Sequence, residues 1–239
     1  MDVIGSSVAA DGELNISAKD DVNILAVNDS DYSYFKKTVK KSFGRSKTTI
    51  RESYNETVKG SALSGENINV SAHKIEGVQL AGGESDIQLV GANLNATENV
   101  NLSADGDVVL AAQSYKQYHR EESIKKGLGG LSGKRKGSID DATLLNSANV
   151  ITGANVNIAA GNDIGVIASN VVAGGNVDLE ALDQLLVSAG EELKQAQQWS
   201  EKTSFLSGGS LFEMEKKRSG VESKTAKAST IQSGGDINA

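Results

Sequence analysis

The chain has 239 residues, a formal net charge of −7, no cysteine and no proline. Without cysteine it has no disulfides, no thiol catalysis and no cysteine-ligated zinc. Only 4% of the residues are aromatic, so any core must be aliphatic rather than built on large rings. No run of about 18 apolar residues is present, and we therefore expect no transmembrane helix.

Short alternations of apolar and polar residues recur along the chain. The stretch "NVNLSADGDVVLAAQS" at 99–114 returns as "NVNIAAGNDIGVIAS" at 155–169 and as "NVDLEALDQLLVSAG" at 176–190. In the first of these, Val100 and Leu102 share one face of an extended strand, because side chains alternate with period two. The same alternation occurs at 14–18, 22–26, 68–72, 100–104, 108–112, 156–160, 164–168, 177–181 and 185–189.

The spacing of these alternations predicts the fold. Val156 and Ile164 are 8 residues apart, whereas Val156 and Val177, at equivalent places, are 21 apart. A third apolar point, as at Leu94, completes three short strands in a coil of about 21 residues. Such strands are too short for a sandwich, but stacked coils of them form an all-β, right-handed parallel β-helix. We expect about six or seven coils.

Two further features concern neighbouring coils. Outward asparagines at equivalent positions are expected to form hydrogen-bonded ladders. The distance from Ile68 to Val100 is 32 residues, which is not a multiple of 21, so the register between them stays open.

Three long insertions interrupt what we interpret as one β-helical repeat domain over 1–239, a segment of a longer protein. They cover approximately 31–60, 115–147 and 194–230, and each leaves after an equivalent strand, at one corner of the coil. We expect β-hairpins that turn in "KKSFGRSK", "GLGGLSGKRKG" and "FLSGGSLF". The alternatives are flexible solvated loops, and a short helix over "EELKQAQQWSEK".

Charge and aromatic residues are concentrated in these insertions. They hold 22 of the 24 Lys and Arg residues with 11 of the 31 Asp and Glu, a charge of +11, which leaves −18 for the repeats. All ten aromatic residues are there too. Basic residues beside amphipathic rings suit an anionic membrane interface, although the rings could instead only pack each hairpin against the coils. The predicted interaction ridge consists of Tyr34, Phe35, Lys36, Lys37, Lys40, Lys41, Arg45, Tyr118, Lys125, Lys126, Lys134, Arg135, Lys136, Trp199, Phe212, Lys216, Lys217 and Arg218.

The sequence contains only weak signals for a phosphate-binding loop, a metal site or a catalytic site. "GLGGLSGKRKG" has neither the spacing nor the Ser or Thr of a phosphate-binding loop. His73 and His119 lie in different parts of the chain, so we expect no metal and no cofactor. Asp105 and Asp107, with the basic His73–Lys74 pair, leave a β-helical polysaccharide-active enzyme or a carbohydrate-binding module as the alternative function, but turn geometry explains Asp-Gly-Asp equally well. We predict no catalytic residues and, from the net charge, no nucleic-acid partner.

The stretch "GANVNIAAGNDIGVIASNVVAGGNVDLEA", combined with the basic insertions, resembles the haemagglutinin repeats of filamentous haemagglutinin-like proteins. These are exoproteins of bacterial two-partner secretion systems, and they include adhesins and effectors of contact-dependent growth inhibition. The resemblance implies a secreted, non-enzymatic stalk segment at the cell surface, serving adhesion or toxin delivery. The partners it implies are the target-cell outer membrane, with its anionic lipids or proteins, and neighbouring repeats of the same polypeptide.

Overall fold

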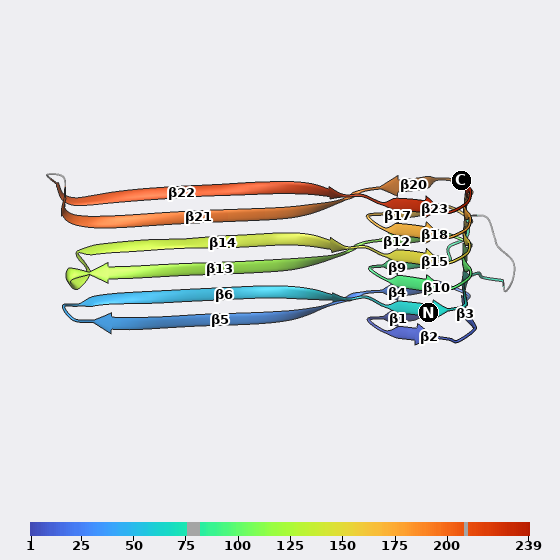
Figure 1. Ribbon diagram of the computed structural model, residues 1–239, viewed down its shortest axis with the longest axis horizontal. Coiled ribbons are helices and arrows are strands. Elements are labelled where there is room, and N and C mark those ends of the chain that lie inside the picture. The colour runs from blue at the N-terminus through green and yellow to red at the C-terminus, as the bar shows by residue number, and fades with distance from the viewer. Residues whose placement is uncertain (76–81, 208–209) are drawn as a thin grey trace.

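The computed structural model describes residues 1–75, 82–207 and 210–239. These residues form two parts (Figure 1). One is a column of stacked coils, and the other is a long sheet of hairpins, the blade, which extends from one side of the column. The described elements are strands apart from one turn of 3₁₀ helix, η1 (Leu128–Gly130).

Three parallel sheets build the column, and each has six strands in the described part of the chain. The first sheet contains β1 (Asp2–Ile4), β4 (Val22–Leu25), β9 (Ile87–Val90), β12 (Val108–Ala111), β17 (Ile164–Ile167) and β20 (Leu185–Ser188). The second contains β2 (Ser7–Ala9), β7 (Ala62–Gly65), β10 (Asn93–Ala96), β15 (Asn149–Thr152), β18 (Asn170–Ala173) and β23 (Thr230–Ser233). The third contains β3 (Glu13–Ala18), β8 (Asn67–Ala72), β11 (Val100–Ala104), β16 (Val156–Ala160), β19 (Val177–Ala181) and β24 (Ile237–Asn238).

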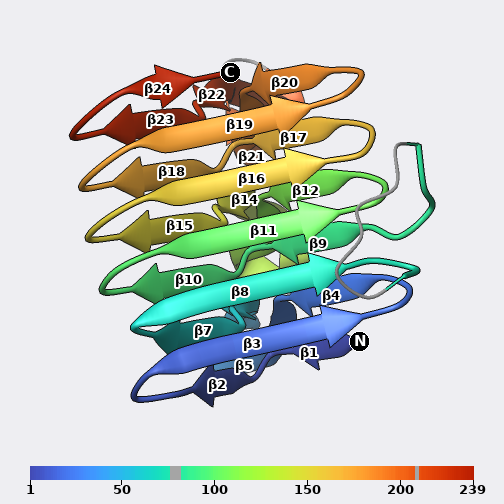
Figure 2. The ribbon, with the colours of Figure 1, turned by 90° about the vertical axis from the view of Figure 1, so that its right-hand side faces the viewer.

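The coil is right-handed, as predicted. In Figure 2 the strands of the third sheet cross the front from left to right, the chain returns behind them, and successive coils climb from the N-terminus to the C-terminus. Successive strands of one sheet pair in parallel and in register, as Val156 does with Val177 and Ile164 with Leu185. The predicted parallel β-helix with coils of about 21 residues is confirmed.

An aliphatic core fills the column. The inward residues of each alternation are buried, among them Leu14, Ile68, Val100, Leu102, Val156, Ile158, Val177 and Leu179. Because each strand contributes only two or three such residues, no coil buries enough apolar surface alone, and the coils depend on stacking. None of the aromatic residues takes part in the described core, which matches the composition.

The irregular interval between Ile68 and Val100 has a local cause. These two residues pair directly, although they are 32 positions apart. Between β8 and β9 the chain has 14 residues, 73–86, where only three residues, 105–107, separate the equivalent strands β11 and β12. The 11 extra residues account for the difference between 32 and 21, so the register that the sequence left open is continuous.

Asparagine ladders join the coils on the outside of the column, as predicted. The amide nitrogen of Asn69 donates to the side-chain oxygen of Asn15 at 2.8 Å, and Asn101 donates to Asn69 at 2.7 Å. Asn157 continues the ladder by donating to Asn101 at 2.7 Å. Each amide thus donates to one coil and accepts from the next, so these polar side chains also help to fix the register.

The three insertions are β-hairpins, as expected. Their strands are β5 (Val27–Lys41), β6 (Arg45–Lys59), β13 (Gln113–Gly127), β14 (Ser132–Asn146), β21 (Gly190–Ser207) and β22 (Ser210–Lys227). These strands begin two to four residues before the expected insertions. The first two turns lie within "KKSFGRSK" and "GLGGLSGKRKG", whereas residues 208–209 of the third fall outside the described residues. The helical alternative for "EELKQAQQWSEK" is wrong, because these residues lie in β21 and pair with both of its neighbours.

The hairpins leave from every second coil, always between the first and the second sheet. In the intervening coils the same corner is a tight turn that contains Gly5, Gly91 or Ala168, each with a positive φ. At Gly91 a Cβ atom would lie 2.7 Å from the Cβ of Gln113 and 2.9 Å from that of Ala26. Because Gly91 has no Cβ atom, its tight turn fits between the bases of the first and second hairpins.

Shortening a core residue is expected to destabilise the column. Leu102 is buried in the middle coils, so Leu102→Ala should lower the free energy of unfolding by about 2–5 kcal/mol through lost burial and a residual cavity. Ile151→Ala, which changes a half-exposed side chain on an outer face, is the control and should cost less than about 1 kcal/mol. Denaturant titration followed by circular dichroism measures both. Equal losses for the two variants would contradict the assignment of the core.

Candidate functional site

The blade is a six-stranded antiparallel sheet in the order β22-β21-β14-β13-β6-β5. Neighbouring hairpins pair with each other, β6 with β13 and β14 with β21. Directly paired residues of an antiparallel sheet project to the same face, and successive residues alternate, so the register assigns every side chain to a face. One face carries the paired residues Tyr32, Tyr54 and Tyr118, and we call it the tyrosine face.

The opposite face is the lysine face. Four lysines lie side by side on it, one on each of four adjacent strands: Lys47 pairs with Lys125, Lys125 with Lys134, and Lys134 with Lys202. We call these four residues the lysine row.

Both faces of the blade are open to solvent. Among the blade residues whose side chains are described, Glu122 is the one buried residue, with 1% of its side chain exposed. A single layer with two solvated faces has no hydrophobic core. Backbone pairing and contacts between cross-strand neighbours must therefore hold it together.

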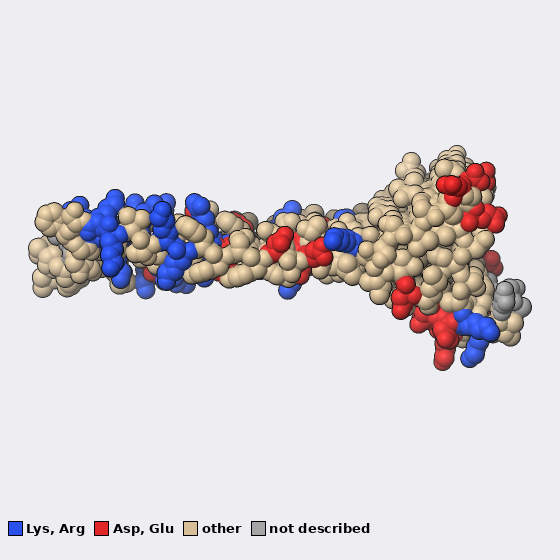
Figure 3. Space-filling model, turned by 90° about the horizontal axis from the view of Figure 1, so that it is seen from below, with Lys and Arg blue, Asp and Glu red and all other residues tan. Residues whose placement is uncertain are grey.

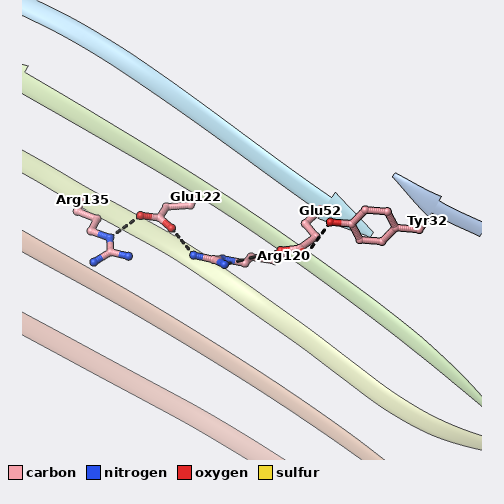
Figure 4. Close-up of polar contacts among 5 residues, drawn as sticks. All are labelled: Tyr32, Glu52, Arg120, Glu122 and Arg135. Atoms are coloured by element: carbon pink, nitrogen blue, oxygen red, sulfur yellow. Dashed lines mark hydrogen bonds and ion pairs between the residues drawn. The ribbon is translucent and has the colours of Figure 1, made fainter. Parts of the chain in front are cut away.

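A series of polar side-chain contacts crosses the tyrosine face and includes the buried carboxylate of Glu122 (Figure 4). Arg120 donates to Oε2 of Glu122 at 2.7 Å, and Nε of Arg135 donates to Oε1 of the same residue. On its other side Arg120 lies 3.7 Å from Glu52, which accepts a hydrogen bond of 3.1 Å from the Tyr32 hydroxyl. These side-chain contacts thus link four adjacent strands, β5, β6, β13 and β14.

The two arginines set the ionisation of Glu122. The hydrogen bond from Arg135 holds the pKa of Glu122 below its ordinary value against the opposing effect of burial, and Arg120 acts in the same direction. The pKa values of both guanidinium groups are raised in return, first by their hydrogen bonds to Glu122. A carboxylate buried between two cations stays ionised, so it joins β13 to β14 electrostatically.

Trp199 packs within the blade and not against the column. It pairs with Gly137, and a Cβ atom on that glycine would lie only 2.4 Å from Cζ2 of the indole. The ring therefore covers the backbone of β14. At this position the ring stabilises the blade and does not fasten its hairpin to the coils.

Charge is distributed unevenly along the blade. The distal half, which we define as residues 34–52, 120–139 and 197–220, contains 17 Lys and Arg residues and six Glu, a formal charge of +11. The rest of the three hairpins contains five Lys and eight Asp or Glu, which is −3, and the remainder of the chain carries −15. Figure 3 shows basic side chains gathered toward the far end of the blade and acidic ones on the column.

Beyond the basic residues, the tip of the blade is apolar. Phe43, in the first turn, is 83% exposed, and Leu206 and Leu211, at the end of the third hairpin, are 71% and 68% exposed. Phe205 and Phe212 contact each other there, with ring centroids 5.3 Å apart. Exposed apolar groups at the end of a cationic sheet are typical of surfaces that meet another phase or a partner.

The structure places every residue of the predicted ridge in the blade but divides them between its faces. The register puts Tyr34, Lys36, Lys40, Tyr118, Lys126, Arg135, Trp199, Lys216, Arg218 and Phe212 on the tyrosine face. It puts Phe35, Lys37, Lys41, Arg45, Lys125, Lys134, Lys136 and Lys217 on the lysine face. The ridge is therefore a two-faced blade and not one surface, because the hairpins form a single layer.

Three important residues were absent from the predicted ridge. Lys47 and Lys202 complete the lysine row, and Glu122 is the buried carboxylate. Lys47 and Lys202 lie in segments whose basic character is evident in the sequence, but their alignment follows from the pairing of separate hairpins. No sequence pattern indicated the burial of Glu122.

The column carboxylates considered for catalysis serve the backbone. Asp105 is buried, with Oδ1 2.9 Å from Nδ1 of His73, and Oδ2 accepts the backbone N–H of Lys74 at 2.8 Å. Asp107 accepts the backbone N–H of Asp163 at 3.1 Å. His119 lies on β13 in the blade, away from His73. Within the described ranges, no group of three or more potential ligands is arranged to hold a metal ion, and no helix is long and apolar enough to cross a membrane.

Replacing the buried carboxylate is expected to destabilise the blade in a pH-dependent way. Because the folded pKa of Glu122 is depressed, its stabilising effect is complete above an unfolded pKa of about 4.3 and is lost as the pH falls through the folded value. Glu122→Gln should therefore lower the free energy of unfolding by about 1–3 kcal/mol at neutral pH. Denaturant titrations from pH 7 to 3 should show this difference shrinking below about pH 4. A constant difference would contradict the proposed ion pairs.

Adding a methyl group under the indole should loosen the blade. Gly137→Ala brings Cβ within 2.4 Å of Trp199 and 2.7 Å of the Glu121 carbonyl oxygen, so we expect a loss of about 1–3 kcal/mol. Trp199 is the single tryptophan, and its fluorescence emission should shift to the red as the ring is displaced. The control is Gly220→Ala, whose nearest atom is 3.5 Å away. Unchanged emission in Gly137→Ala would count against the packing described.

Comparisons with known proteins agree with this architecture. The hemagglutinin repeat family model matches residues 39–145 and 130–239. The "tRNA nuclease CdiA" of Yersinia mollaretii is 30% identical over 220 residues, which covers 84% of this chain and 7% of that protein. The "tRNA nuclease CdiA-2" of Burkholderia pseudomallei is 28% identical over 220 residues, 87% of this chain and 7% of the relative. The "16S rRNA endonuclease CdiA" of Enterobacter cloacae is 29% identical over 197 residues, 75% of this chain and 6% of the relative.

No solved structure is significantly similar to the chain. The chain spans less than a tenth of the length of these relatives, so their names describe far larger proteins. The match of the repeat model to most of the chain, together with the stacked coils, identifies the family. The chain belongs to the hemagglutinin repeat family, as a repeat segment of the filamentous haemagglutinin-like kind.

Proposed function

We propose that this chain is a non-enzymatic stalk and interaction segment of a secreted bacterial cell-surface exoprotein. In this proposal the column supplies length and the blade contacts the outer membrane of a target cell, in the service of toxin delivery or adhesion. The relatives support a role within a very long polypeptide. Half-exposed Leu186 and Val187 on β20 suit contact with neighbouring repeats of the same polypeptide.

One observation supports membrane contact above all: apolar, basic and acidic residues follow one another in this order from the tip of the blade to the column. Apolar Phe43, Leu206 and Leu211 form the tip, 17 basic residues follow in the distal half, and the negative column lies farthest back. An apolar tip can enter the interfacial region of a bilayer, where lysines and arginines at head-group depth each contribute about 1 kcal/mol on an anionic surface. The acidic column is repelled from the same surface.

The alternative of a polysaccharide-active enzyme has less support. A glycoside hydrolase needs two carboxyl groups facing a substrate at a workable separation. The column carboxylates Asp105 and Asp107 instead accept hydrogen bonds from backbone N–H groups of adjacent coils.

Vesicle binding tests the proposal. A distal variant with six lysines changed to Gln should bind anionic phosphatidylglycerol vesicles at least about 100-fold more weakly than wild type at low salt. The six changes are at Lys36, Lys37, Lys134, Lys136, Lys216 and Lys217. Arg135 is kept because it pairs with buried Glu122. A tip variant, with Phe43, Leu206 and Leu211 changed to Ser, should also bind more weakly.

The control changes net charge by the same amount outside the distal half, with Lys to Gln at positions 19, 59, 74, 116, 194 and 224. It should bind nearly as well as wild type. Circular dichroism confirms that each variant is folded. Wild-type-like binding by the folded distal variant would refute membrane engagement by the blade.

A further inference from the structure

We propose that the lysine face is a binding site for the phosphate groups of a multiply phosphorylated saccharide headgroup. This inference rests on the proposed function, because the headgroup is one displayed by the membrane that the blade meets. The central element is the lysine row, Lys47, Lys125, Lys134 and Lys202. Its ligand is defined by chemistry, as two or more phosphates held a fixed distance apart by sugar rings.

The lysine row is electrostatically unfavourable without a ligand. Neighbouring strands lie about 4.8 Å apart, so four ammonium-bearing side chains occupy a line of about 15 Å on one face. Like charges directly opposite each other destabilise a sheet. In the part of the blade that the structure describes, none of these four lysines forms an ion pair. The acidic group at the end of the row, Glu215, is paired with Lys217 at 2.8 Å and attracts Lys202 and Lys134 more weakly.

The neighbouring row supplies groups suited to a sugar phosphate. There the sequence of paired residues across the blade is Lys37, Thr49, Ser123, Lys136, Ser200 and Lys217. The three hydroxyl groups are partly buried between the longer lysines. Hydroxyls beside cations can donate to and accept from both phosphate oxygens and sugar hydroxyls.

A shallow groove of about 730 Å³ runs over this surface. Its lining includes Thr49, Ser123, Lys136, Ser200 and Lys217 of the hydroxyl-bearing row and Lys47 of the lysine row. The one carboxylate in the lining, Glu121, is paired with Arg51 at 3.2 Å. The groove thus lies over the hydroxyl-bearing row and reaches the lysine row at Lys47. A concave surface with convergent charged and hydroxyl groups is where a compact polar headgroup is held best.

The other face of the blade differs. In the distal half, the lysine face has ten basic residues and three Glu, whereas the tyrosine face has seven basic residues and three Glu. On the tyrosine face Arg120 and Arg135 are engaged by Glu122, and Arg218 lies 3.8 Å from Glu201. On the lysine face Glu121 is paired with Arg51, and Glu213 and Glu215 lie on the edge strand β22. Among the described residues of the distal half, most basic side chains that form no ion pair therefore lie on the lysine face.

The distance from the apolar tip to the lysine row also suits binding to membrane headgroups. Lys47 and Lys125 lie three or four residues back from the turns, about 10–13 Å from the apolar tip at 3.3 Å per residue. A tip inserted in the interfacial region of a bilayer would place the row among phosphorylated headgroups.

Matched variants on the two faces test the inference. One changes Lys47, Lys125, Lys134 and Lys202 to Gln. The control changes four lysines of the tyrosine face, Lys36, Lys40, Lys126 and Lys216, to Gln, with the same change in net charge. The probes are vesicles of phosphatidylcholine doped with bisphosphorylated lipid A, the same vesicles with monophosphorylated lipid A, and vesicles doped with phosphatidylglycerol.

We expect the wild type and the tyrosine-face variant to prefer bisphosphorylated over monophosphorylated vesicles. The lysine-face variant should lose that preference and bind the bisphosphorylated vesicles about 100-fold more weakly. The same variant should unfold at an equal or higher temperature than wild type, because it relieves repulsion within the row. Equal losses in the two variants, or none in either, would overturn the assignment of this face.

Two further arms separate this inference from the proposed function. If wild type binds no vesicle but binds a soluble sugar bisphosphate through the lysine row, membrane engagement fails and the phosphate site stands. If wild type binds phosphatidylglycerol vesicles through the distal lysines but shows no preference between the two lipid A forms, membrane engagement stands and the site assignment fails. Competition by duplex DNA as strong as that by the sugar bisphosphate would identify a general polyanion surface and would also overturn it.

Discussion

Hydrogen bonding between coils sets the geometry of the whole molecule. Parallel strands stack at about 4.8 Å per coil, and a hairpin is two strands, or two such spacings, wide. Hairpins inserted at every second coil therefore occupy the full height of the column without gaps, and neighbouring hairpins meet at hydrogen-bonding distance. Insertion at every coil would crowd them, and insertion at every third would leave edges unpaired. The blade exists because an insertion period of two coils matches the width of a hairpin.

Column and blade are stabilised by different interactions, and this difference explains where function can reside. The column buries aliphatic side chains such as Leu102 and Ile158 and joins its coils with asparagine ladders, so most of its positions are committed to structure. The blade has no apolar core in its described part, and its one buried side chain, Glu122, is a carboxylate fixed by two arginines. Two faces of a single-layer sheet are then free to carry chemistry. A lysine row that weakens the sheet is tolerated there because the column holds the hairpin bases in place.

The sequence predicted the column because period-two alternation and the 21-residue spacing are local signals, as in the strands around Val100 and Val108. It also predicted three hairpins and their charge. It could not predict the pairing of β6 with β13, since strands polar on both faces have no apolar pattern to pin their register. The lysine row and the burial of Glu122 follow from that pairing. The 11 extra residues within 73–86 showed in the sequence as an irregular spacing of 32 residues, but their place within that interval could not be read, because an insertion at a corner does not change the alternation on either side.

Charge polarity along the long axis gives the molecule a preferred orientation at an anionic surface. The distal half of the blade carries +11, the rest of the hairpins −3 and the remainder −15, so an anionic surface attracts one end of the molecule and repels the other. A blade that lay flat would bring the acidic column against the surface, whereas an upright blade keeps it more than a Debye length away, about 8 Å at physiological salt. Upright blades on successive repeats of a long polypeptide would present their lysine faces in parallel. Under the proposal that the lysine face binds phosphorylated headgroups, multivalency would raise the avidity of such an array beyond that of any single blade.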